Sequence, residues 1–115
     1  MPTTAEPGDG VLVRFPFTDL TTTKVRPAFV LATHGDDMTI VGVFSSVPQP
    51  VRSTWLVIGV QDPHFAATGL RTASTIKAER IAVIEQSLLV RKLGVLPPAH
   101  FQRLREAVKR SLGLE

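Results

Sequence analysis

Residues 24–31 read Lys24-Val25-Arg26-Pro27-Ala28-Phe29-Val30-Leu31, and this stretch carries the strongest signal in the chain. The apolar run that follows Arg26 is rich in aromatic and β-branched residues and predicts a strand over 27–33. Arg26 is therefore expected at the mouth of a strand. A guanidinium stays protonated and offers a planar set of N–H donors, so it can hold a phosphate and stabilise charge that develops during phosphoryl transfer.

Other short strands surround this stretch. Three are expected from β-rich runs that turn residues separate, over 11–17, 38–44 and 54–58. Two polar or proline-containing loops, over 18–24 and 45–50, connect them, and function tends to reside on such loops.

The C-terminal half predicts two more short strands and two helical segments. The strands are expected over 70–76 and 79–86 with a turn near Ala78, whereas 88–95 is compatible with either a strand or an irregular connection. A short helical turn over 62–68 is expected to end at Gly69. A longer helix should run from Pro98 to Gly113, because four apolar residues fall on one helical stripe: Phe101, Leu104, Val108 and Leu112.

These elements predict a mainly β fold with a C-terminal helix, arranged as a small, strongly curved antiparallel sheet or half-open barrel. A chain of 115 residues with 43% hydrophobic and 20% charged residues is expected to form one domain over 1–115. The sequence contains no cysteine, no signal-peptide pattern at its start and no apolar run of the roughly 20 residues that a membrane span requires. A cytoplasmic protein without disulfides or membrane contact is expected.

The charge is distributed unevenly along the chain. Residues 1–70 contain four Lys or Arg and six Asp or Glu, whereas residues 71–115 contain nine and four. A basic C-terminal half suits a polyanion or an acidic protein partner, although a solvated basic helix face would give the same count.

Several pieces of this sequence, taken in order, resemble the PemK/MazF toxin family. They are Gly8-Asp9-Gly10-Val11-Leu12-Val13, Phe15-Pro16-Phe17-Thr18-Asp19-Leu20, Lys24-Val25-Arg26-Pro27-Ala28-Phe29-Val30-Leu31, Ser45-Ser46, Gly69-Leu70 and Leu93-Gly94-Val95-Leu96. The resemblance covers nearly the whole chain, and its most specific part is the first half.

The resemblance implies an SH3-like β-barrel, related to that of CcdB, that forms a homodimer. It implies the toxin of a type II toxin–antitoxin system, an endoribonuclease that cleaves single-stranded RNA at short sequences with neither a metal nor another cofactor. The implied partner is an antitoxin whose acidic C-terminal tail occupies the RNA groove, and operator DNA would be bound only by the toxin–antitoxin complex.

The resemblance also implies a site. It assigns catalysis to Arg26 and to Ser45, with Ser46 as the alternative if the strand register differs by one residue. RNA carries its own nucleophile, the 2′-hydroxyl, so Arg26 would chiefly stabilise charge and Ser45 would donate its hydroxyl to a phosphate oxygen. Four further residues on or beside the bordering loops are expected to contact phosphates or base edges: Asp19, Lys24, Gln49 and Arg52.

Other residues receive structural interpretations. Trp55 could stack on a base, but a tryptophan within an apolar strand is expected in the core or the dimer interface. The three histidines show no spacing typical of a metal cluster or a catalytic pair, so no metal site is predicted.

Two alternative functions stay open. A gyrase poison like CcdB would act through the end of its C-terminal helix, but the chain ends in Ser111-Leu112-Gly113-Leu114-Glu115 and lacks the aromatic residue that this mode uses. A toxin-like module that binds RNA or an antitoxin without catalysis is also compatible, because Ser45 replaces the threonine of many family members and no general base is evident.

Overall fold

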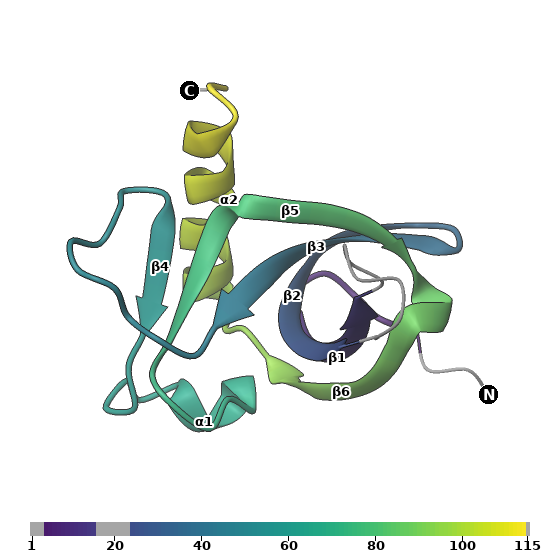
Figure 1. Cartoon of the computed structure of the whole chain (residues 1–115), viewed down its shortest axis with the longest axis horizontal. Coiled ribbons are helices and arrows are strands. Elements are labelled where there is room, and N and C mark those ends of the chain that lie inside the picture. Colours follow the sequence, from purple (N-terminus) through teal and green to yellow (C-terminus); the bar gives the residue numbers. More distant parts are fainter. Residues whose placement is uncertain (1–3, 16–23, 115) are drawn as a thin grey trace.

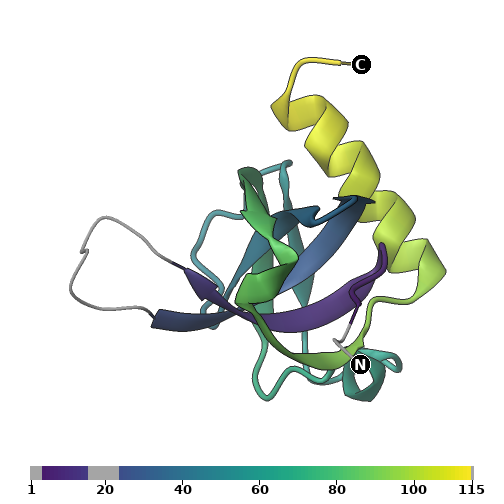
Figure 2. The same ribbon diagram turned by 90° about the vertical axis from the view of Figure 1, so that its right-hand side faces the viewer.

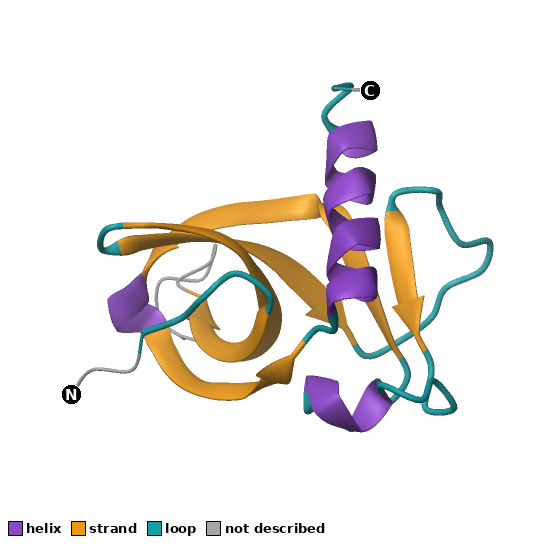
Figure 3. Cartoon of the chain, turned by 180° about the vertical axis from the view of Figure 1, so that it is seen from behind, coloured by secondary structure: helices purple, strands orange, loops and turns teal. Residues whose placement is uncertain are grey.

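The computed structural model of the chain describes residues 4–15 and 24–114. These residues form six strands in one antiparallel sheet, with helices at one end and one side of it (Figures 1 and 3). The elements, in chain order, are β1 (Asp9–Phe15), β2 (Lys24–His34), β3 (Asp37–Phe44), β4 (Trp55–Ile58), α1 (Phe65–Thr68), β5 (Ser74–Glu85), the 3₁₀ helix η1 (Gln86–Leu88), β6 (Leu89–Val95) and α2 (Pro98–Ser111). The prediction of a mainly β fold with a C-terminal helix is confirmed.

The sheet is curled and open. Its strands lie in the order β4-β5-β3-β2-β1-β6, and β1, β2 and β6 wind round a common interior (Figure 1). Strand β6 pairs with β1 although the two are far apart in sequence. Within the described residues β4 and β6 form the two edges and do not pair with each other, so the barrel is half-open.

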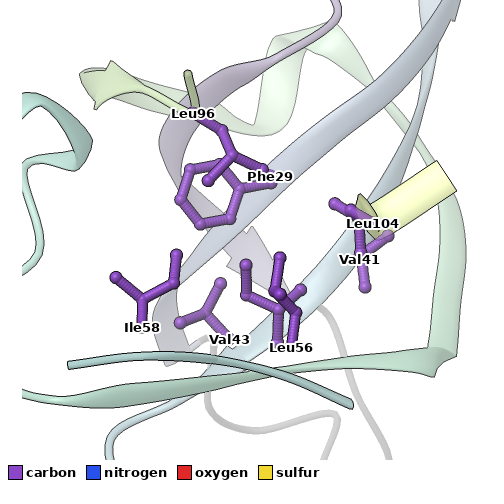
Figure 4. Close-up of a cluster of buried hydrophobic side chains, with 8 residues drawn as sticks. Phe29, Val41, Val43, Leu56, Ile58, Leu96 and Leu104 are labelled. Carbon is purple, nitrogen blue, oxygen red and sulfur yellow. The ribbon is translucent and has the colours of Figure 1, made fainter. Parts of the chain in front are cut away.

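Two hydrophobic clusters pack on the two faces of this sheet. Successive residues of β2 belong to different clusters, because alternate side chains of a strand point to opposite faces. Ala28 and Val30 pack with residues of β1 and β3 in the first cluster. Phe29 belongs to the second cluster, which also contains Val41 and Leu104 (Figure 4). Helix α2 supplies Leu104 and packs against β4 and β5, so it covers one side of the sheet (Figure 2).

Strand β2 begins earlier than the sequence predicts, at Lys24 instead of Pro27. Residues 24–29 all pair with β1. On the other side, the pairing with β3 reaches only Ala28, which lies opposite Gly42. Pro27 comes next and has no amide hydrogen to donate, so the ladder between β2 and β3 ends there.

The sequence prediction is wrong for the strands of the C-terminal half. Residues 74–85 form one continuous strand, β5, and Ala78 is buried within it, so the two strands and the intervening turn are wrong. The polar residues around Ala78 produced the turn signal. They mark a bulge, because Val41 pairs with Ile81 while Val43 pairs with Ile76. The ambiguous segment 88–95 is mostly strand β6.

Helix α2 follows its prediction with one exception. It begins at Pro98 and is followed by Gly113 in the left-handed conformation, with a φ of 70°. Leu104 is buried, and Phe101 and Val108 pack against the second cluster. Leu112 lies beyond the last helical residue and is 58% exposed, so it does not belong to the apolar stripe.

Candidate nucleic-acid interface

Arg26 lies where the β2–β3 ladder ends. It is exposed in β2, opposite Val13 of β1. Among residues 4–15 and 24–114, no carboxylate comes within ion-pair distance of its guanidinium. On the N-terminal side of Ala28, strand β2 is no longer paired with β3. Pro27 and Val43 lie at this point and line both of two neighbouring cavities.

The first of these cavities, the Arg26 cavity, has a volume of about 650 Å³. Strand β2 contributes Arg26, the end of β3 contributes Phe44, and the bulge of β5 contributes Glu79 and Arg80. A bulge changes the direction of side chains along a strand, and here it brings charged residues to the same side as Phe44.

A neighbouring hollow extends this cavity toward β4. It has a volume of about 460 Å³ and shares Glu79 and Arg80 with the Arg26 cavity. Trp55, Lys77 and Arg52 also line it. We refer to the charged and aromatic residues of the combined lining as the basic–aromatic surface, which consists of Arg26, Phe44, Arg52, Trp55, Lys77, Glu79 and Arg80.

Cations and aromatic rings alternate on this surface. The Lys77 ammonium lies 4.5 Å from the ring centroid of Phe44 and 4.7 Å from that of Trp55. The Arg52 guanidinium lies 5.3 Å from the Trp55 ring. These distances are within the range of cation–π attraction. Alternating rings and cations are also the elements with which proteins bind single-stranded nucleic acid, because the rings stack on bases and the cations contact phosphates.

Glu79 is the one acidic residue of the basic–aromatic surface. Its carboxylate accepts hydrogen bonds from the Thr54 hydroxyl, at 2.6 Å, and from the indole Nε1 of Trp55, and it lies 3.8 Å from Arg52. Burial raises the pKa of Glu79, but the hydrogen bonds from Thr54 and Trp55 outweigh it, so the pKa lies below its ordinary value. Glu79 is therefore ionised at neutral pH and holds Trp55 in position.

Ser45 lines the second cavity, the Ser45 cavity, which has a volume of about 390 Å³. Two guanidiniums line it as well, Arg71 from the α1–β5 connection and Arg91 from β6. Arg26 and Ser45 thus lie in neighbouring cavities that share Pro27 and Val43. Ser46 lines neither cavity, and its carbonyl accepts a hydrogen bond from Thr75 at 2.6 Å.

The remaining predicted contact residues lie at different places. Arg52 belongs to the basic–aromatic surface. Lys24 is exposed at the start of β2, where it pairs with Phe15, and lines neither of the two cavities. Gln49 is exposed in the β3–β4 connection. Asp19 lies outside the described residues.

Sequence reasoning missed several residues of this site. Trp55, which was considered for stacking but expected in the core or the dimer interface, is only partly buried and lines the surface, so it does not belong to the core of this chain. Lys77 and Glu79 were not predicted as site residues, because the bulge of β5 was interpreted as a turn. Their alternation with buried Ile76 and Ala78 was the available signal, since it is the period of a half-buried strand.

Two of the histidines come together, His64 immediately before α1 and His100 in the first turn of α2. His100 Nε2 lies 2.8 Å from Asp62 Oδ2, and the His64 ring meets the His100 ring edge-on at 5.6 Å. The hydrogen bond to His100 and that from the His64 amide hold the pKa of Asp62 below its ordinary value. Nowhere in 4–15 or 24–114 do three His, Asp or Glu side chains form a group that could hold a metal ion. No helix within those ranges is long and apolar enough to cross a membrane.

Comparison with known proteins gives a family match over nearly the whole chain. Residues 6–112 match the model of the PemK-like, MazF-like toxin of type II toxin–antitoxin systems. No curated protein sequence matches the chain.

Solved structures share its fold. One is described as an endoribonuclease in complex with its cognate antitoxin from Mycobacterial species; it has a TM-score of 0.73 and 19% identity, with 97% of this chain and 98% of that chain covered. The Mycobacterium tuberculosis toxin MazF-mt6 has a TM-score of 0.72 and 18% identity over 93% and 98% of the two chains. A MazE-MazF structure from Deinococcus radiodurans has a TM-score of 0.70 and 19% identity over 98% and 100%.

Proposed function

We propose, because the chain belongs to the PemK-like, MazF-like toxin family of type II toxin–antitoxin systems, that it is a toxin acting as an endoribonuclease on single-stranded RNA. The observation that carries the proposal is an exposed guanidinium, Arg26, that has no carboxylate partner in the described residues and shares a cavity with an aromatic ring and a carboxylate. Two structures of the same fold are described as endoribonucleases.

The proposed reaction is attack of the RNA 2′-hydroxyl on the adjacent phosphorus. The O2′–P bond forms, the P–O5′ bond breaks, the 2′-hydroxyl loses its proton and the leaving 5′-oxygen gains one. The products are a 2′,3′-cyclic phosphate and a 5′-hydroxyl. Because the nucleophile belongs to the substrate, the protein must align the attack and stabilise the extra negative charge. No metal or cofactor takes part in the proposed reaction.

Arg26 is proposed to stabilise that charge, since a guanidinium is a poor proton donor and acceptor near neutrality. Ser45 would donate its hydroxyl to a phosphate oxygen from the other side of the Pro27 and Val43 wall. Glu79 is the carboxylate of the Arg26 cavity and is proposed to accept the proton of the 2′-hydroxyl. Its lowered pKa makes it a weak base, but it is already ionised at the pH of the cell.

The RNA bases are proposed to stack along the basic–aromatic surface, where Arg52 would contact a neighbouring phosphate. Sequence preference would come from the loops over 17–24 and 46–53, with Asp19, Lys24, Ser46 and Gln49 as the contacting side chains. These loops lead into β2 and β4, the strands that carry Arg26 and Trp55.

The proposed partners follow from the same surface. Structures of this fold are described as a complex with a cognate antitoxin and as MazE-MazF. An antitoxin with an acidic C-terminal tail would pair with the cations of the basic–aromatic surface and exclude RNA. We propose further that the toxin is a cytoplasmic homodimer and that operator DNA is bound only by the toxin–antitoxin complex.

Cleavage of single-stranded RNA in the presence of a chelator tests the proposal. We expect fragments that end in a 2′,3′-cyclic phosphate, and no cleavage where the nucleotide at the cut is replaced by its 2′-deoxy form. Arg26→Ala should lower kcat by on the order of 100- to 1,000-fold, the usual effect of losing one stabilising donor. Arg103→Ala, which removes an exposed cation of α2, is the matched control and should cleave like the parent.

Absence of cleavage by the parent on a diverse RNA pool, or identical activity of Arg26→Ala and the parent, would contradict the enzyme assignment. RNA binding without cleavage would favour a non-catalytic module, and DNA breakage that depends on gyrase would favour a poison like CcdB.

A further inference from the structure

The Ser45 cavity contains two guanidiniums that the proposed chemistry does not use. Arg71 and Arg91 come from different parts of the chain, and within the described residues neither has a carboxylate at ion-pair distance. The neighbouring Lys92 of β6 does have one, because its ammonium lies 3.2 Å from Asp9. Strand β6 thus presents one cation that is neutralised by an internal acid and another that is left available to a ligand.

The same cavity also offers hydroxyl groups. Ser45 and Thr72 line it and are exposed, and no residue of the described chain forms a hydrogen bond with the Ser45 hydroxyl. Ser74 is buried and its hydroxyl donates to the Thr72 carbonyl at 2.8 Å, which fixes the loop that carries Arg71. Guanidinium and hydroxyl donors are the groups with which proteins hold a phosphate.

Two glycines hold the walls of this cavity together. A Cβ atom on Gly69 would lie 2.1 Å from the Leu93 carbonyl oxygen, and one on Gly94 would lie 2.3 Å from the Ala67 carbonyl oxygen. The end of α1 and strand β6 therefore touch backbone to backbone. Arg71 follows one glycine by two residues and Arg91 precedes the other by three, so the distance between the attachment points of the two arginines is fixed before any ligand arrives. Such preorganisation lowers the cost of binding.

We propose that the two guanidiniums of the Ser45 cavity bind the phosphate of the RNA strand next to the one that Arg26 and Ser45 contact. This inference rests on the proposed function and adds a second backbone contact to it. RNA is favoured over an acidic peptide because Pro27 and Val43 form walls of both the Ser45 cavity and the Arg26 cavity. An RNA strand that crosses the end of the β2–β3 ladder would place one phosphate in the Arg26 cavity and the next in the Ser45 cavity.

Binding of an RNA that cannot be cleaved tests this inference apart from catalysis. The probe is a single-stranded 2′-O-methyl RNA of random sequence, with Kd measured across a range of salt concentrations. The variant Arg71→Gln/Arg91→Gln is compared with Arg103→Gln/Lys109→Gln, which removes two exposed cations of α2 that line neither cavity. Thermal melting of both variants shows that they fold.

Loss of one phosphate contact should reduce the slope of log Kd against log salt by about 0.7, the value for one phosphate of a single strand. Binding at low salt should weaken by roughly 10-fold in the same variant, and Arg71→Lys/Arg91→Lys should recover most of it, since a lysine keeps the charge. The control variant should keep the slope of the parent.

An unchanged slope in Arg71→Gln/Arg91→Gln, or an equal loss in the control, would overturn the inference. So would a variant that binds RNA like the parent but loses affinity for an acidic peptide, because the cavity would then serve a protein partner. If the variant and the parent differ in slope as expected but the parent cleaves no RNA, the proposed enzyme activity is contradicted and the phosphate site is supported.

Discussion

The indole of Trp55 donates a hydrogen bond to the carboxylate of Glu79, which also lines the cavity that contains Arg26. One acid thus fixes the orientation of an aromatic ring and lines the same cavity as a guanidinium that has no carboxylate partner among the described residues. The pair connects β4 to the bulge of β5 and joins the part of the surface suited to stacking with the part suited to phosphate chemistry.

Replacing Glu79 separates these two roles. Glu79→Gln keeps an oxygen that can accept from Trp55 but removes the negative charge. If Glu79 takes the proton of the 2′-hydroxyl, kcat should fall by about 100-fold or more, the usual contribution of a general base. RNA affinity should not fall, since the change removes a repulsive charge. Single-turnover cleavage and binding assays measure the two quantities, and an unchanged kcat would exclude Glu79 as the base.

Trp55 is the single tryptophan of the sequence, so its fluorescence reports on the basic–aromatic surface alone. Binding of single-stranded RNA should quench it. Trp55→Ala should weaken RNA binding by about 1–3 kcal/mol, the usual contribution of one stacked base. Trp55→Phe keeps a ring and should retain most of the affinity. Equal affinity of the alanine variant and the parent would show that RNA does not stack at this position.

The contact between Asp62 and His100 should stabilise the protein in a pH-dependent way. The pKa of Asp62 in the folded protein lies below its ordinary value of 3.8, so its contribution to stability is present above that value and is lost as the pH falls through the folded pKa. Asp62→Asn should therefore lower Tm near neutrality, and the difference from the parent should shrink well below pH 3.8. Calorimetric melting at both pH values measures it; a constant difference would contradict this account.

The close approach of α1 and β6 can be tested at Gly94. Gly94→Ala places a methyl group against the Ala67 carbonyl, where only backbone movement can relieve the clash. Overpacking of this kind should cost about 3 kcal/mol of unfolding free energy. Gly59→Ala is the matched control, because no atom lies within 4 Å of the added carbon. Chemical denaturation measures both variants, and equal stability would mean that the two segments can separate freely.

Local patterns predicted much of this fold, as β2 and β3 illustrate. Each contains an apolar run, and the turn residues Gly35 and Asp36 separate the two, so their identity does not depend on distant contacts. The bulge of β5 depends on such contacts. Three of the four residues from Lys77 to Arg80 are charged, and the pairing of Ile76 with Val43 and of Ile81 with Val41 shows that the strand continues through them.

The candidate site likewise contains residues that local sequence indicates and residues that only distant contacts bring together. Arg26 was predicted as a site residue from the Arg26-Pro27 pair together with the family resemblance around it, and the same proline explains why the ladder with β3 ends beside it. Trp55 and Glu79 are 24 positions apart, and no local spacing connects them. Arg71 and Arg91 belong together only because Gly69 and Gly94 bring α1 and β6 into contact.

The pairing of β1 with β6 also determines when the Ser45 cavity can form during synthesis of the chain. Arg91 and Leu93 belong to β6, so a nascent chain has no complete Ser45 cavity until β6 has left the ribosome. Contacts between such remote segments form late in folding. If the Ser45 cavity holds an RNA phosphate as proposed, a ribosome that is still translating β6 is not exposed to the complete site on its own product.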